Sequence, residues 1–178
     1  DLVNGILERV NVLLNQGITT IEIKSGYGLN VNEELKMLRA IKKAQDLTKA
    51  TLVPTCLSAH LKPRDFEGTS EEYLNYILNE ILPKVKEENL ANRVDIFIEK
   101  SAFQLEESKN FLAKAKELGF QITVHADQFT AGSSRIAVEV GAKSADHLEA
   151  TIDEDIEFLA NSNTVAIALP GASLGLGE

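Results

Sequence analysis

Three histidines are the residues of this sequence best suited to metal binding or proton transfer, and each comes at the end of a short apolar run. His60 occurs in "SAHLKP", His125 in "QITVHADQF" and His147 in "SADHLE". Neutral imidazole is the commonest metal ligand among side chains, and its pKa near neutrality allows it to transfer protons at working pH. A divalent zinc or iron site is therefore one interpretation of these positions.

Each histidine also has a purely structural interpretation. His125 would then be a core histidine that donates to a backbone carbonyl, His60 would only start a loop, and His147 would cap the following helix. The two interpretations differ in geometry, because a shared site requires the three rings to face one cavity.

Other polar residues follow the same kind of apolar run. Tyr27 lies in the turn "SGYG" and is a candidate hydroxyl donor or only a turn residue, and Gln128 follows His125. Asp127 is expected to orient or cap rather than to bind a metal. Glu99 follows the third expected strand and would line the same cavity, or alternatively form a buried ion pair with Lys100 or Lys24.

Segments whose apolar residues recur at helical spacing alternate along the chain with short apolar runs typical of strands. This alternation predicts about six βα units. The expected strands cover residues 18–24, 51–57, 94–98, 121–124, 144–146 and 164–169. The expected helices cover residues 2–14, 33–47, 70–88, 106–118, 136–140 and 153–160. The strands mostly lack polar alternation, which is typical of parallel β-structure covered by helices. No linker divides the chain, so residues 1–178 are expected to form a single domain.

This pattern fits a (β/α)8 barrel or an open doubly wound sheet. The carboxyl ends of barrel strands converge on one face, where such enzymes keep their active sites, and the histidines follow several different strands. A doubly wound sheet would gather its polar residues near one switch point, often with a Gly-rich phosphate loop. Residues 25–28 lack the G-x-G-x-x-G spacing, so nucleotide binding is disfavoured.

Composition restricts the partners. The chain of 178 residues has 44% apolar residues, and its 27 acidic and 18 basic residues give a net charge of −9. This charge disfavours nucleic acid and anionic membranes as partners. No apolar run approaches the roughly 18 residues of a spanning helix. The only cysteine, Cys56, excludes an internal disulfide and suits a cytoplasmic protein.

Five motifs together resemble imidazolonepropionase, a family of the amidohydrolase superfamily, over nearly the whole chain. They are "TTIEIKSGYGL", "SAHLKP", "HADQF", "GAKSADHLE" and "VAIALPGAS". The resemblance implies a partial (β/α)8 barrel of the TIM type, an α/β fold whose six strands here correspond to strands 2–7. It also implies a fragment that lacks N-terminal and C-terminal parts of its parent.

The same resemblance implies hydrolysis of 4-imidazolone-5-propanoate to N-formimino-L-glutamate, a step of histidine degradation. One divalent metal, zinc or iron, would be bound by His125. Tyr27 and His60 match substrate-binding positions, and His147 matches a catalytic position near the reacting group. Gln128 stands where many members carry glutamate, and it is assigned to substrate binding because an amide cannot act as a base.

The family's other metal ligands have no counterpart in this sequence, since it contains no H-x-H pair. The metal site is therefore expected to be incomplete here, the fragment alone to be nearly inactive, and the full-length protein to be a homodimer. Three alternatives stay open. They are a non-catalytic barrel fragment or pseudoenzyme, a doubly wound small-molecule-binding module, and another amidohydrolase such as a cyclic amidine deaminase.

Overall fold

A parallel β-sheet forms the centre of the computed structural model, which describes residues 1–177. Its six strands are β1 (Thr20–Lys24), β2 (Thr51–Ala59), β3 (Arg93–Phe97), β4 (Gln121–Ala126), β5 (Ser144–His147) and β6 (Val165–Ile167). Every strand pairs in parallel with the next strand along the chain, so the spatial order is β1-β2-β3-β4-β5-β6. A doubly wound sheet requires a reversal of strand order, and these six strands show none.

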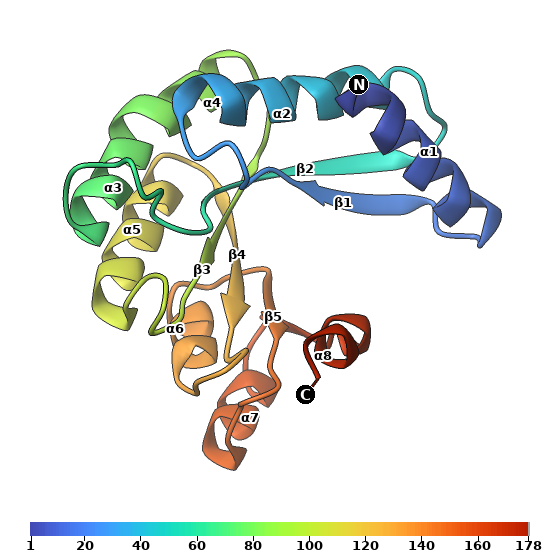
Figure 1. Ribbon diagram of the computed structural model, residues 1–178. Helices are drawn as coiled ribbons and strands as arrows, with labels where there is room; N and C mark the ends of the chain where they lie inside the picture. The colour runs from blue at the N-terminus through green and yellow to red at the C-terminus, as the bar shows by residue number, and fades with distance from the viewer. Residues whose placement is uncertain (178) are drawn as a thin grey trace.

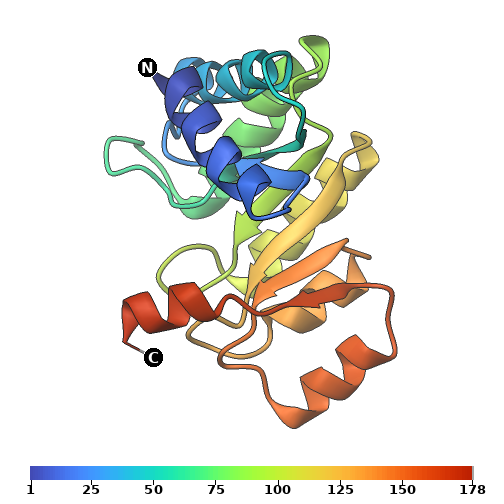
Figure 2. The same ribbon diagram turned by 90° about the vertical axis from the view of Figure 1, so that its right-hand side faces the viewer.

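The sheet curls into an arc; the helices that precede β6 in the chain cover its outer side, whereas the C-terminal helix lies on the open side of the arc (Figure 1). The helices are α1 (Leu2–Asn15), α2 (Val31–Gln45), α3 (Ser70–Tyr76), α4 (Leu82–Glu87), α5 (Leu105–Glu117), α6 (Ser133–Glu139), α7 (Asp153–Ala160) and α8 (Pro170–Leu176). Figure 2 shows α1 and α2 at one end of the arc and α8 at the other. The six strands thus form a curled half-barrel. Within residues 1–177, no helix is both long and apolar enough to cross a bilayer.

Two elements differ from the sequence-based expectation. The expected helix over residues 70–88 contains a π-helical turn, Ile77–Ile81, between α3 and α4. Pro83 lies in the first turn of α4, where its missing N–H cannot continue a regular helix. The expected strand over residues 164–169 shortens to β6, and Pro170 begins α8, because proline suits the first position of a helix.

The hydrophobic core lies between the sheet and the outer helices. Its largest fully buried side chains include Tyr73, Phe103, Phe111, Ile77, Ile81 and Leu82. On β3, Val94 and Ile96 join this core, whereas the intervening Asp95 is ion-paired with residues of other strands. Side chains of a strand alternate between its two faces, so Asp95 faces the concave side. The concave face is therefore where the buried polar residues of the sheet gather.

Candidate active site

A lysine and two aspartates form the base of the concave face. Nζ of Lys24 lies 2.6 Å from Oδ2 of Asp95 and 2.7 Å from Oδ2 of Asp146. The three residues come from β1, β3 and β5, as expected where alternate strands contribute one layer of inward side chains to a barrel. Burial opposes the charge of Lys24, but the two carboxylates outweigh it and raise the lysine pKa above its ordinary value. Lys24 is thus a fixed internal cation.

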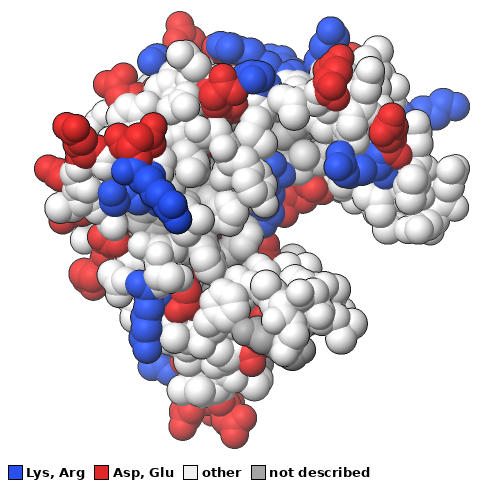
Figure 3. Space-filling model, viewed as in Figure 1, with Lys and Arg blue, Asp and Glu red and all other residues white. Residues whose placement is uncertain are grey.

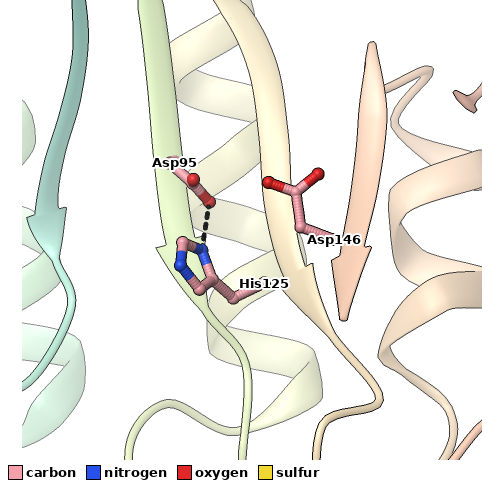
Figure 4. Close-up of side chains that lie close together, drawn as sticks. All are labelled: Asp95, His125 and Asp146. Atoms are coloured by element: carbon pink, nitrogen blue, oxygen red, sulfur yellow. Dashed lines mark hydrogen bonds and ion pairs between the residues drawn. The ribbon is translucent and has the colours of Figure 1, made fainter. Parts of the chain in front are cut away.

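His125 stands beside this cluster and is oriented by Asp95. Nδ1 of His125 lies 3.1 Å from Oδ1 of Asp95 (Figure 4). A carboxylate only accepts, so Nδ1 carries the proton and Nε2 of a neutral ring keeps its lone pair. Burial of Asp95 opposes its ionisation, but His125 and Lys24 hold the pKa of Asp95 well below its usual range. This carboxylate–imidazole arrangement is the one that orients metal-binding histidines in proteins.

Asp95, His125 and Asp146 bring metal-binding atoms close together, and Lys24 already pairs with both carboxylates. One ligand atom from each of Asp95, His125 and Asp146 lies within 4.8 Å of the others. Within residues 1–177, Oδ1 of Asp146 is buried and has no hydrogen-bond partner. A buried carboxylate oxygen without a partner is costly, and a bound cation would relieve that cost. The single imidazole and the unsatisfied oxygen are the features that match a metal.

Only His125 of this group was expected from the sequence to bind a metal. Asp95 carries a weak signal, since it is an acidic residue between the apolar Val94 and Ile96 of β3. Asp146 precedes His147 directly, and Lys24 ends β1. Nothing in the sequence pattern indicates that these residues meet, because Lys24 and Asp146 are 122 positions apart.

The three histidines form a row with Tyr27 above this cluster. The ring centroids of His60 and His125 lie 6.2 Å apart, and those of His125 and His147 lie 5.2 Å apart. Tyr27 meets His60 edge to face with centroids 5.4 Å apart. The strand ends therefore bring these rings together, as the interpretation of a shared site requires.

His60 has a defined tautomer in this row. Its Nδ1 lies 3.0 Å from the backbone oxygen of Gly26, and a carbonyl cannot donate, so Nδ1 is the donor. Nε2 of the neutral ring is consequently an acceptor. Tyr27, on the same loop as Gly26, is 80% exposed, so its hydroxyl is available to a ligand.

His147 ends β5 with a backbone φ of 89°, and Leu148 follows with a φ of 72°. Left-handed conformations at non-glycine residues store strain and are often found at functional sites. The ring is buried, and its Nδ1 lies 3.7 Å from Oε2 of Glu149, beyond hydrogen-bond distance. Burial and the neighbouring His125 lower its pKa, against the opposing effect of Glu149 and Asp146. The interpretation as a helix cap is wrong, since α7 has Ile152 as its N-cap.

The alternative of an ion pair between Glu99 and Lys24 or Lys100 is not what the described residues show. Its carboxylate accepts hydrogen bonds from the hydroxyl of Thr130 at 2.5 Å and from the backbone N–H groups of Phe129 and Thr130 at 3.1 Å. A buried carboxylate can be satisfied by several N–H and O–H donors without a cation. Glu99 therefore anchors the loop between β4 and α6.

The same loop contains Asp127 and Gln128. Asp127 is fully buried and accepts from the backbone N–H groups of Ser133 at 2.7 Å and Ser134 at 3.0 Å. These serines begin α6, so the expectation of a capping carboxylate is confirmed. Gln128 is partly buried between the two anchors formed by Asp127 and Glu99.

The concave side is open to solvent. Figure 3 shows the molecule hollowed between its two ends, with both acidic and basic side chains on the inner wall of the hollow. A small polar molecule could reach the row of rings from this side.

Comparison with known proteins gives close relatives in sequence. The chain is 44% identical over 178 residues to an imidazolonepropionase of Caldanaerobacter subterraneus subsp. tengcongensis, and the alignment covers 99% of the chain and 43% of the relative. It is 45% identical over 177 residues to an imidazolonepropionase of Myxococcus xanthus and 46% identical over 179 residues to one of Bacillus mycoides, covering 42% of each. The chain thus spans less than half the length of these relatives. No protein-family model matches it.

Among solved structures, the chain resembles a crystal structure described as an uncharacterized protein. The TM-score is 0.61 at 13% sequence identity, and the match covers 92% of this chain and 45% of the other. At this identity the similarity supports the fold alone.

Proposed function

The chain belongs to the imidazolonepropionase family, and from this we propose that the full-length protein hydrolyses 4-imidazolone-5-propanoate to N-formimino-L-glutamate in histidine degradation. The observation that carries the proposal is the row of His60, His125 and His147 at the rim of the half-barrel. Active sites of (β/α)8 enzymes lie at this rim. We propose that the six strands correspond to strands 2–7 of an amidohydrolase barrel of the TIM type. Residues 1–178 would then form part of a single barrel domain.

We propose that His125 holds one divalent metal, zinc or iron, through Nε2. Asp95 supports this role because it fixes the proton on Nδ1. When bound, such a metal supplies a hydroxide-like nucleophile near neutral pH and polarises a carbonyl oxygen. Lys24 balances the two aspartates and thereby limits the negative charge beside His125. Further ligands would come from parts of the parent outside these residues.

Three residues are proposed to bind the substrate. The lone pair on Nε2 of His60 suits an N–H donor, which an imidazolone ring offers. Tyr27 has an exposed hydroxyl that can donate to the propanoate tail, and Gln128 can orient the substrate from the loop after β4.

Opening the ring breaks a C–N bond, and the leaving nitrogen must receive a proton. His147 is proposed to accept a proton from the attacking water and to donate it to the leaving nitrogen, since its lowered pKa favours the neutral ring that can accept a proton.

Several further proposals concern the parent. We propose that these 178 residues alone have little activity, and that the parent is a cytoplasmic homodimer that does not bind nucleic acid. The net charge of −9 supports the last point.

Metal analysis and turnover of the full-length protein test the proposal, with wild type, His125→Ala and Asp155→Asn compared. Asp155 is a buried carboxylate on α7 that pairs with Arg135, away from the row of rings, and provides a matched control. The wild type and Asp155→Asn are expected to hold metal and open the imidazolone, whereas His125→Ala loses both. Turnover by a metal-free wild type would refute the metal-dependent mechanism, and absence of any turnover would favour a non-catalytic barrel.

A further inference from the structure

We propose that Glu34 is a positioning residue that fixes the loop of residues 25–29 and thereby places Tyr27 and His60 for substrate binding. This inference rests on the proposed function. Glu34 lies in the first turn of α2 and is fully buried, and the hydrogen bonds of its carboxylate within residues 1–177 go to residues other than the rings of the row.

The carboxylate of Glu34 is surrounded by donors from the loop. Its Oε1 accepts the backbone N–H groups of Gly28 at 2.8 Å and Leu29 at 2.9 Å. The N–H of Gly26 lies 3.2 Å from both carboxylate oxygens, and the hydroxyl of Ser58 lies 3.2 Å from Oε2. A buried charge is tolerated when it is fully hydrogen-bonded, and the first turn of a helix also favours negative charge. Glu34 thus binds three of the five amide groups of the loop.

The glycines of the loop are required by its close approach to neighbouring backbone. A Cβ atom at Gly28 would lie 2.6 Å from the backbone nitrogen of Glu34, and one at Gly26 would lie 2.8 Å from the oxygen of Leu57. Gly26 also has a φ of 110°, which other residues rarely adopt. The loop therefore has one well-defined conformation against α2 and β2.

The same loop carries both proposed substrate-binding groups. Gly26 offers its N–H to Glu34 and its carbonyl to Nδ1 of His60, so the glycine joins the carboxylate to the histidine. Tyr27 follows at once, is 80% exposed, and has the His60 ring as its aromatic neighbour. Because Tyr27 is so exposed, the loop backbone is what sets the place of its hydroxyl. Removing the anchor should therefore move both rings together.

Two variants of the full-length protein separate this role from a general effect on folding. Glu34→Met keeps the length and the helix propensity of the side chain but removes every acceptor. Glu34→Gln keeps one oxygen for Gly28 and Leu29, and its NH2 group can donate to Ser58, so it serves as the conservative variant. Asp155→Asn again controls for the loss of a buried carboxylate elsewhere.

Steady-state kinetics shows whether a change at Glu34 alters KM, kcat or both. Loss of interactions made equally in the ground and transition states raises KM and leaves kcat unchanged. Glu34→Met is expected to raise KM roughly tenfold to a hundredfold, with Glu34→Gln between it and the wild type. When Tyr27→Phe and His60→Ala are already present, Glu34→Met should add less than about a twofold further change, because coupled residues are not additive. A KM unchanged in both Glu34 variants, or a fully additive effect, would overturn the inference.

Amide hydrogen exchange provides a readout that does not depend on activity. Exchange at Gly28 and Leu29 is expected to be faster in Glu34→Met than in Asp155→Asn, and unchanged exchange would also overturn the inference. If Glu34→Met does not fold, Glu34→Gln decides by the same two measurements. If the wild type shows no turnover, the proposed function fails, and exchange alone decides whether Glu34 fixes the loop.

Discussion

Lys24 on β1 and Asp146 on β5 are ion-paired across the concave face, with 2.7 Å between Nζ and Oδ2. Three strands, β2, β3 and β4, lie between β1 and β5 in the sheet. Only a strongly curled sheet lets a lysine side chain reach so far. The ion pair therefore links the curvature of the sheet to the charge beside His125.

Replacing Lys24 by methionine should destabilise the full-length protein. The change leaves the buried carboxylates of Asp95 and Asp146 close together without their cation, and breaking a buried ion pair in this way costs about 3–5 kcal/mol. Urea denaturation of each variant measures the free energy of unfolding. Lys36→Met, which removes the exposed pair with Glu33, should stay within about 0.5 kcal/mol of wild type. Equal effects of the two changes would show that the internal cation does not matter.

Asp95→Asn should weaken metal binding without removing His125. An amide can donate to Nδ1 as well as accept from it, so the ring no longer has one fixed tautomer. Loss of such a partner typically lowers metal affinity about 10- to 100-fold. Competition with a chelator, followed by elemental analysis, measures this affinity. An affinity equal to that of Asp155→Asn would exclude the orienting role of Asp95.

His147→Ala should affect the rate more than binding. The proposed proton transfer contributes roughly 10²- to 10⁴-fold to the rate, so kcat of the full-length protein should fall within that range while the metal content stays at the wild-type level. Steady-state kinetics together with metal analysis separates this outcome from that of His125→Ala. If KM rises and kcat is preserved, His147 binds substrate and does not transfer the proton.

Glu99 should make stability depend on pH. Burial alone would raise its pKa, but hydrogen bonds from Thr130, Lys100 and Phe129 outweigh burial and lower it. A lowered folded-state pKa stabilises the protein above the unfolded value of about 4.3, and this contribution is lost as the pH falls through the folded pKa. Glu99→Gln should thus cost about 1–3 kcal/mol at neutral pH, and the difference should shrink in acid.

Unfolding at neutral pH and below pH 4.3 checks the prediction for Glu99. Glu117→Gln, at an exposed position at the end of α5, is the control. A difference that is constant with pH would mean that the carboxylate charge is not what anchors the loop after β4.

The sequence by itself predicted the succession of strands along the chain and the position of each histidine near a strand end, whereas the order of the strands within the sheet stayed open until the structure showed it. Apolar runs separated by helical periods predict parallel strands, and consecutive parallel strands send their carboxyl ends to the same rim. The interpretation of a shared site required His60, His125 and His147 to meet, and their rings do. The motifs around these histidines also pointed to the family, which the relatives at 44–46% identity confirm. The cap formed by Asp127 was also predicted, since its partners lie six and seven residues away.

Only the tertiary structure decided which distant groups meet. The pairing of Lys24 with Asp95 and Asp146 joins residues 71 and 122 positions apart, and it depends on how strongly the sheet curls. Glu34 looks like an ordinary acidic residue at the start of an amphipathic helix, and its burial follows from the path of a neighbouring loop. Periodicity reports which face of an element is apolar, whereas the partner of a buried charge is set by the packing of several elements at once.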